Sequence, residues 1–157
     1  MNQKIRDREL KKYYLCIVHG TLPRPAGRLE GYILKDEAKK QVTVSSRPRP
    51  GAKTAVTLYE TLAVRNGLSL VRCQLITGRT HQIRAQFAAA GHPLLGDGKY
   101  GSERQNKRYG RSYQALYSYR LEFCFTTDAG ALAPLDGQQF QVEQVDFVTE
   151  YFPGFSL

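Results

Sequence analysis

The sequence predicts a single domain of the mixed α+β class, built on a mainly antiparallel sheet with few helices. The main observation is a hairpin pattern: residues 54–64 alternate between apolar and polar side chains, and a second alternating run ends at Leu75. Asn66-Gly67 separates the runs, and this pair readily takes the positive φ angles of a tight turn. A second observation is that strongly helical character is confined to residues 80–90. The 157 residues show no internal repeat and no domain boundary.

The remaining elements follow from short apolar or alternating runs bounded by glycine and proline. Strands are predicted at residues 13–19, 29–34, 41–45, 119–125 and 139–145. Residues 146–152 are predicted to form a short terminal helix or turn. The basic segment 46–53 is predicted to be a surface loop because it contains two prolines and a glycine, and the segment 97–114 is predicted to be an exposed loop because it has no apolar periodicity.

The helix predicted over residues 80–90 is rich in alanine. Ile83 and Phe87 recur one turn apart, and Gly91 is a natural C-terminal stop. His81 and Arg84 are three residues apart, so they are predicted to be neighbours on one helix face.

Charge is the main compositional signal. Lys and Arg number 23 against 14 Asp and Glu, which gives a net charge of +9, and the sequence pI is about 9.6. Such a surplus attracts phosphate backbones. No apolar run is long enough to span a bilayer, and the charged N-terminus lacks the apolar core of a secretory signal, so a cytoplasmic location is expected. Cys16, Cys73 and Cys124 have no metal-binding spacing and are expected to be reduced core residues.

A dinucleotide-binding loop is one interpretation of the glycine-rich stretch. Gly96, Gly98 and Gly101 satisfy the G-x-G-x-x-G pattern. The pattern needs a strand before it and an apolar-faced helix after it, whereas here a helix precedes and the polar residues 102–112 follow. The sequence therefore disfavours a dinucleotide site, and no cofactor is predicted.

A metal site is the second interpretation, with His81, His92 and either Asp97 or Cys73 as ligands. Their spacing matches no known ligand pattern. No metal is predicted.

Four sequence blocks carry a family resemblance. In chain order, the blocks are "KKYYLCIVHG" (11–20), "AVTLYETL" (55–62), a signature made of "TGRTHQIR" (77–84), "GHPLLGD" (91–97) and "YG" (100–101), and finally "ALYSYRLEF" (115–123). In this order they resemble the RNA pseudouridine synthases, in particular the RluA-type branch. The last block has Tyr117 where that family usually has histidine. The resemblance implies part of the pseudouridine synthase fold and isomerisation of uridine in ribosomal or transfer RNA, without metal or cofactor.

The resemblance also implies site residues. The family uses a nucleophilic aspartate, an arginine paired with it, a tyrosine that stacks on the base and is implicated in proton removal, and an aliphatic residue beneath the ring. On this chain the arginine is Arg84, the tyrosine is Tyr14 and the aliphatic residue is Ile83, although Tyr13 is a competing candidate for the inward-facing position. A guanidinium suits the pairing, because it holds a carboxylate in a fixed geometry and keeps it ionised.

Other residues of these blocks are assigned to RNA contact or to loop structure. Predicted phosphate contacts are Arg47, Arg49, Lys99, Arg104, Lys107, Arg108 and Arg111. Three residues are expected either to buttress the loop or to contact phosphate, namely Arg79, His81 and Gln82. Structural roles are expected for Gly78, Gly91, His92, Gly96, Asp97 and Tyr100, with Asp97 anchoring backbone amides.

The nucleophilic aspartate has no counterpart in the sequence. In this family it lies in an H-R-L-D segment upstream of the tyrosine strand, and no such segment occurs in the 157 residues. We therefore expect the chain to be the C-terminal part of a catalytic domain, inactive by itself and prone to self-association through the surface left uncovered. Arg84 is expected to pair with a solvent anion or a neighbouring carboxylate instead. The alternative is a non-catalytic RNA-binding module or assembly partner derived from the same family.

Overall fold

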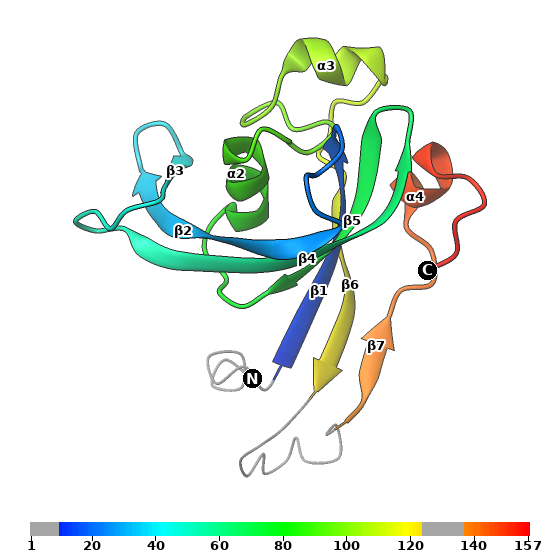
Figure 1. The fold of residues 1–157 in the computed structure, drawn as a ribbon, viewed down its shortest axis with the longest axis horizontal. Coiled ribbons are helices and arrows are strands. Elements are labelled where there is room, and N and C mark those ends of the chain that lie inside the picture. Colours follow the sequence, from blue (N-terminus) through cyan, green and yellow to red (C-terminus); the bar gives the residue numbers. More distant parts are fainter. Residues whose placement is uncertain (1–9, 124–136) are drawn as a thin grey trace.

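The computed structural model describes residues 10–123 and 137–157, and in this part of the chain one antiparallel sheet dominates (Figure 1). Its order is β3-β2-β4-β5-β1-β6-β7, and every neighbouring pair is antiparallel. The strands are β1 (Leu10–His19), β2 (Ala26–Asp36), β3 (Gln41–Ser45), β4 (Lys53–Arg65), β5 (Leu68–Leu75), β6 (Leu116–Phe123) and β7 (Gln139–Gln141). The helices are α2 (Gln82–Ala89), α3 (Glu103–Arg108) and α4 (Asp146–Tyr151). The predicted class, mixed α+β with few helices, is confirmed.

The hairpin predicted around Asn66-Gly67 is present as β4 and β5. Asn66 has φ 53° and Gly67 has φ 74°, so both turn residues take the left-handed conformation that this turn requires. The register shifts by one residue between Thr61 and Ala63, which marks a β-bulge in β4.

Strand β1 is buried on both faces, which explains its continuous apolar sequence. Leu15 and Ile17 belong to a cluster that includes Phe147 of α4. Cys16 and Val18 point to the other face and pack in a cluster with residues of α2. The sheet therefore separates α4 on one side from α2 on the other.

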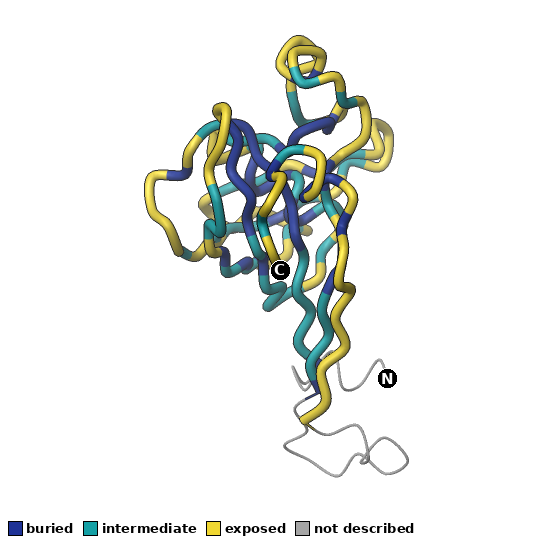
Figure 2. Tube along the Cα trace, turned by 90° about the vertical axis from the view of Figure 1, so that its right-hand side faces the viewer, coloured by how far each residue is buried: buried dark blue, intermediate teal, exposed yellow. Residues whose placement is uncertain are grey.

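Burial is concentrated where the helices cover the sheet (Figure 2). The far ends of β1, β6 and β7 extend away from this region as a narrow three-stranded arm whose residues are mainly half-buried or exposed. No helix in the described ranges is long and apolar enough to cross a membrane.

The prediction of an exposed loop over residues 97–114 holds for exposure at most positions but is wrong for the secondary structure. The segment contains helix α3, and Asp97 and Asn106 are 0% and 4% exposed. Ser102 caps the helix, because its hydroxyl accepts a hydrogen bond from the backbone N–H of Gln105. The inward-facing residue of α3 is Asn106, a polar residue, so the helix has no apolar periodicity to reveal it.

Other boundaries also differ from the prediction. The strand expected at 139–145 stops at Gln141. Helix α2 begins at Gln82, and His81 precedes it in the left-handed conformation with φ 52°. The predicted strand 119–125 begins earlier, at Leu116, and its last two residues lie outside the described part of the chain.

The two cysteines in the described ranges are free and buried. Cys16 and Cys73 are both 0% exposed, and their Sγ atoms lie 3.9 Å apart. Cys124 lies outside the described residues.

Candidate active site

Helix α2 is held on the sheet by buried glutamines as well as apolar side chains. Gln86 Oε1 accepts a hydrogen bond of 2.6 Å from the Thr57 hydroxyl, and Gln82 Nε2 donates to the same hydroxyl at 2.8 Å. Gln82 Oε1 accepts from the hydroxyl of Thr77 and the backbone N–H of Arg79. Gln82 is 3% exposed, so it buttresses the 77–82 loop, which was one of its two predicted roles.

Tyr14 and Ile83 lie on the same face of the sheet. Ile83 is 4% exposed and packs in the cluster that Phe87 and Cys73 also join, and Tyr14 is packed against that cluster. Tyr13 lies on the opposite face, against the cluster that contains Leu15. Of the two adjacent tyrosines, Tyr14 is the one that faces α2.

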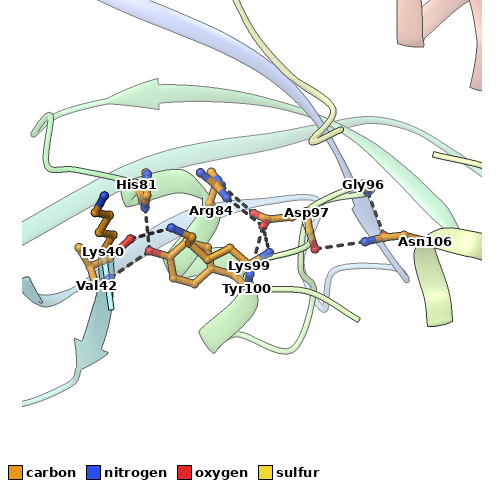
Figure 3. A network of polar contacts seen from close by, with 9 residues as sticks. All are labelled: Lys40, Val42, His81, Arg84, Gly96, Asp97, Lys99, Tyr100 and Asn106. Atoms are coloured by element: carbon orange, nitrogen blue, oxygen red, sulfur yellow. Dashed lines mark hydrogen bonds and ion pairs between the residues drawn. The ribbon is translucent and has the colours of Figure 1, made fainter. Parts of the chain in front are cut away.

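Arg84 forms a two-bond ion pair with Asp97 (Figure 3). Its Nε donates to Oδ2 at 2.8 Å and its Nη2 donates to Oδ1 at 3.0 Å. The Asp97 side chain is fully buried, whereas the Arg84 side chain is 14% exposed. The neighbouring carboxylate expected for Arg84 is therefore Asp97. Within the described residues, Arg84 Nη1 has no hydrogen-bond partner and keeps its donors for a further anion.

The pair keeps both groups ionised. Burial is the largest influence on the pKa of Asp97 and would raise it, but hydrogen bonds from Arg84 and from the backbone amides of Tyr100 and Lys99 outweigh burial and hold the pKa below its ordinary value. The hydrogen bond to Asp97 raises the pKa of Arg84. Helix α2 thus carries a fixed, charged guanidinium at the position next to Ile83.

Asp97 also organises the turn that carries it. Its Oδ1 accepts hydrogen bonds from the backbone N–H groups of Lys99 and Tyr100, which is the anchoring role expected for it. Its backbone carbonyl accepts from Asn106 Nδ2, and Asn106 Oδ1 in turn accepts from the backbone N–H of Gly96 (Figure 3). One buried amide of α3 therefore closes the turn.

Tyr100 connects this turn to α2 and β3. Its hydroxyl accepts from the backbone N–H of Val42 at 2.9 Å and is 2.8 Å from His81 Nδ1 (Figure 3). The Cζ atom of Arg84 lies 5.2 Å from the centre of the Tyr100 ring. The pKa of His81 is lowered by partial burial and by the positive charges of Arg84 and Lys99. His81 thus buttresses the turn.

Most of the basic residues predicted to contact phosphate lie at the surface. The exposed ones are Arg47, Arg49, Lys99, Arg104, Lys107 and Arg108. Arg111 does not fit the prediction: its side chain is 15% exposed, its Nε donates to the carbonyl of Tyr113, and its guanidinium lies over the Phe147 ring near Glu150. Arg79 is half-buried, and its Nε donates to the carbonyl of Thr54.

The glycine and histidine positions of the motif blocks have separate structural roles. Gly91 and Gly96 both have φ above 80°, a conformation that favours glycine. His92 Nδ1 lies 2.9 Å from the backbone carbonyl of His19, at the end of β1. Gly78 is exposed, with open space where a side chain would lie. The sequence analysis did not identify Asn106 or His19. The residues near each of them in the sequence do not indicate that the Asn106 amide is buried, or which groups it and the histidine at the end of β1 contact.

No group of three or more His, Cys, Asp or Glu side chains that could hold a metal ion occurs in the described ranges. The site has a tyrosine, an aliphatic side chain and a charged arginine. This combination suits the binding of a flat ring and of a carboxylate.

Comparison with known proteins identifies the chain's relatives. The family model for RNA pseudouridylate synthase matches residues 1–89, which include Tyr14, Ile83 and Arg84. The chain belongs to the RNA pseudouridylate synthase family. The resemblance found in the sequence blocks is thereby confirmed.

The curated relatives are longer than the chain. It is 39% identical over 103 residues to the uncharacterized RNA pseudouridine synthase YhcT of Bacillus subtilis, covering 64% of this chain and 33% of that protein. It is 32% identical over 145 residues to ribosomal large subunit pseudouridine synthase D of Zymomonas mobilis, covering 92% of this chain and 42% of that protein. The chain thus spans less than half the length of the curated relatives it matches.

The fold agrees with this family. The solved structure of human RNA pseudouridylate synthase domain containing 4 superposes with a TM-score of 0.69 at 23% identity, covering 93% of this chain and 62% of that one.

Proposed function

We propose that this chain forms part of the catalytic domain of an isomerase that converts uridine to pseudouridine in structured ribosomal or transfer RNA. The observation that carries the proposal is that the Arg84 guanidinium, on the same helix as Ile83, is fixed by a buried carboxylate, and that the Ile83 side chain packs in the cluster that Tyr14 also joins. The family match supplies the reaction class.

Each side chain has a proposed role. The Tyr14 ring stacks on the uracil, and Ile83 forms the apolar floor beneath it. Arg84 binds the carboxylate of the nucleophilic aspartate through its remaining N–H donors and keeps that carboxylate ionised for attack. Because Asp97 already holds Nε and Nη2, the guanidinium is oriented before the nucleophile or the RNA arrives.

Asp97 is not the proposed nucleophile. Its side chain is fully buried, and its oxygens accept hydrogen bonds from Arg84 and from two backbone amides. A carboxylate in this position has no path to a sugar carbon. We propose instead that the nucleophile is an aspartate outside these 157 residues, in the H-R-L-D segment typical of the family.

Surface charge supports RNA as the partner. The exposed cations of α3 and of residues 46–52 carry part of the net charge of +9, and such groups bind phosphates without base specificity. We assign to them the backbone contacts of the RNA, and to the Tyr14 face the contact with the target base.

Release of tritium from RNA labelled at carbon 5 of uridine tests the proposal. The 157-residue chain is expected to release none, and the full-length natural protein is expected to release it. In the full-length protein, Arg84→Ala should remove most turnover and keep most RNA affinity, because Arg84 contacts the nucleophile and not the phosphates. RNA binding by the full-length protein without tritium release would favour the non-catalytic alternative. Release by the 157-residue chain would contradict the assignment of the nucleophile.

A further inference from the structure

A pocket of about 500 Å³ lies where the end of β1, the β4–β5 turn and α3 meet, near the top of Figure 1. Its lining consists of His19, Gly20, Asn66, Gly67, Gln105, Arg108 and Tyr109. None of these residues belongs to the proposed active site. The volume falls in the range of sites that hold small organic ligands.

The walls of the pocket are fixed to one another by hydrogen bonds. The backbone N–H of Gly20 donates to the carbonyl of Gly67 at 2.7 Å, and the Ser69 hydroxyl donates to the carbonyl of Gly20 at 2.6 Å. The Tyr109 hydroxyl donates to the carbonyl of Asn66 at 2.6 Å. The β1 end, the hairpin tip and α3 are thus joined, and the pocket is preformed.

His19 presents a hydrogen-bond acceptor. It is 6% exposed, and its Nε2 is 2.8 Å from Asn106 Oδ1. Two other contacts fix the orientation of the Asn106 amide: its oxygen accepts from the Gly96 N–H, and its nitrogen donates to the Asp97 carbonyl. The atom facing His19 is therefore an acceptor oxygen, so His19 Nε2 is the donor. In the neutral ring Nδ1 is then an acceptor, and it has no hydrogen-bond partner among the described residues.

Arg108 and Tyr109 add a cation and an aromatic ring. Arg108 is exposed, and its Cζ lies 5.8 Å from the centre of the Tyr109 ring. The rings of Tyr109 and His19 lie 5.6 Å apart at 49°. The pocket therefore combines an anion-binding group, a ring surface and a buried acceptor.

We propose that this pocket binds one unpaired nucleotide of the RNA, with its phosphate on Arg108 and a base N–H group on His19 Nδ1. The proposal rests on the proposed function for RNA as the partner. A nucleotide carries an anion, a flat ring and an N–H donor together, whereas a free phosphate matches only Arg108 and an acidic peptide offers no flat ring for Tyr109. The pocket gives the RNA a second anchor, separate from the site of the target uridine.

The test is a titration of the 157-residue chain with single-stranded RNA hexanucleotides, monitored by the ring nitrogen resonances of His19. We expect the chemical shift of His19 Nδ1 to change as RNA is added and to reach a plateau when binding is saturated. Arg108→Ala should raise Kd about tenfold and remove this movement of the resonance, since a charge-assisted hydrogen bond is lost. Lys39→Ala is the matched control, because it removes an equal charge from an exposed position that lies outside the pocket and has no assigned RNA contact; it should raise Kd less than about threefold.

Three outcomes would overturn the pocket assignment: RNA binding without movement at His19, equal weakening by both variants, or the same movement with inorganic phosphate or an acidic peptide alone. Failure of the proposed function has a different signature. In that case the hexanucleotides still move the His19 resonance, and the full-length protein releases no tritium.

Discussion

The buried carboxylate of Asp97 holds the guanidinium of Arg84 through two hydrogen bonds from across a turn of the chain. The two residues are 13 positions apart and belong to different segments of one motif block, 77–84 and 91–97. Fixing the guanidinium in this way removes the rotational freedom of a long side chain before substrate arrives. Asp97 is therefore a positioning residue, and its contribution to folding can be measured separately from its effect on catalysis.

Asp97→Asn is expected to lower the free energy of unfolding by about 3 kcal/mol, because it leaves the largely buried Arg84 cation without its counter-charge. Urea denaturation of the 157-residue chain measures the change. Glu60→Gln is the control, since it breaks the more exposed pair with Arg72 and should cost less than about 1 kcal/mol. Equal small losses in both variants would contradict a structural role for the Arg84–Asp97 pair.

The same ion pair predicts that the free energy of unfolding depends on pH. The pKa of Asp97 in the folded chain lies below its ordinary value of 3.8, so the folded state binds this proton less readily than the unfolded state. The stabilisation that ionised Asp97 provides is fully present above the pKa of this group in the unfolded chain. It is lost as the pH falls through the pKa of Asp97 in the folded chain. Urea denaturation between about pH 5 and pH 3 should show a steeper loss for the natural chain than for Asp97→Asn. Parallel slopes would contradict the lowered pKa.

Asn106 is the amide that joins α3 to this turn. Asn106→Ala should lower the free energy of unfolding by about 2 kcal/mol, because it leaves the buried N–H of Gly96 and the buried Nε2 of His19 without their partner. Lys107→Ala, at the adjacent exposed position, should change it by less than about 0.5 kcal/mol. Thermal unfolding of both variants provides the comparison, and similar midpoints would show that the amide does not hold the turn.

The part of the fold that follows from local patterns was predictable. Asn66-Gly67 between alternating runs predicts the β4–β5 hairpin, because few residues tolerate two consecutive positive φ angles. The alanine-rich run before Gly91 predicts α2 for a similar local reason. Helix α3 was missed, although Ser102 and Gln105 form a recognisable N-terminal cap, because its buried residue is polar.

The arrangement of the site was less predictable, because its contacts are long-range. Arg84 was identified by its motif, but nothing near it in sequence indicates that Asp97 is its partner. The choice between Tyr13 and Tyr14 stayed open for another reason. Strand β1 is buried on both faces, so alternation of apolar residues does not distinguish the two sides.

Gly96 is required by space as well as by conformation. Its φ is +83°, and a Cβ atom there would lie 1.8 Å from the backbone oxygen of Tyr113. Gly96→Ala is expected to lower the free energy of unfolding by more than about 3 kcal/mol, because backbone atoms must move. Gly98→Ala is the control, since a Cβ atom at that position would have nothing within 4 Å and its effect should stay below about 1 kcal/mol. Urea denaturation that gave both variants equal stability would contradict the close approach of the two segments.

Substitution of the adjacent residues Tyr14 and Tyr13 tests which face of the sheet binds the target base. In the full-length protein, Tyr14→Phe is expected to reduce tritium release at least about 100-fold, because the family resemblance implies that this tyrosine takes part in proton removal. The ring remains, so RNA affinity should change little. Single-turnover assays at saturating enzyme separate the chemical step from binding.

Tyr13→Phe is the matched control for this experiment, since it removes the same hydroxyl from the opposite face of the same strand. Tyr13 lies against the Leu15 cluster, with the Arg120 guanidinium 5.1 Å from its ring centre, and therefore away from Ile83. We expect Tyr13→Phe to retain tritium release within about threefold of the natural protein, because surface and remote substitutions rarely alter transition-state contacts. If Tyr13→Phe were the variant that lost activity, the base would bind on the α4 face, and the roles proposed for Tyr14, Ile83 and Arg84 would be wrong together.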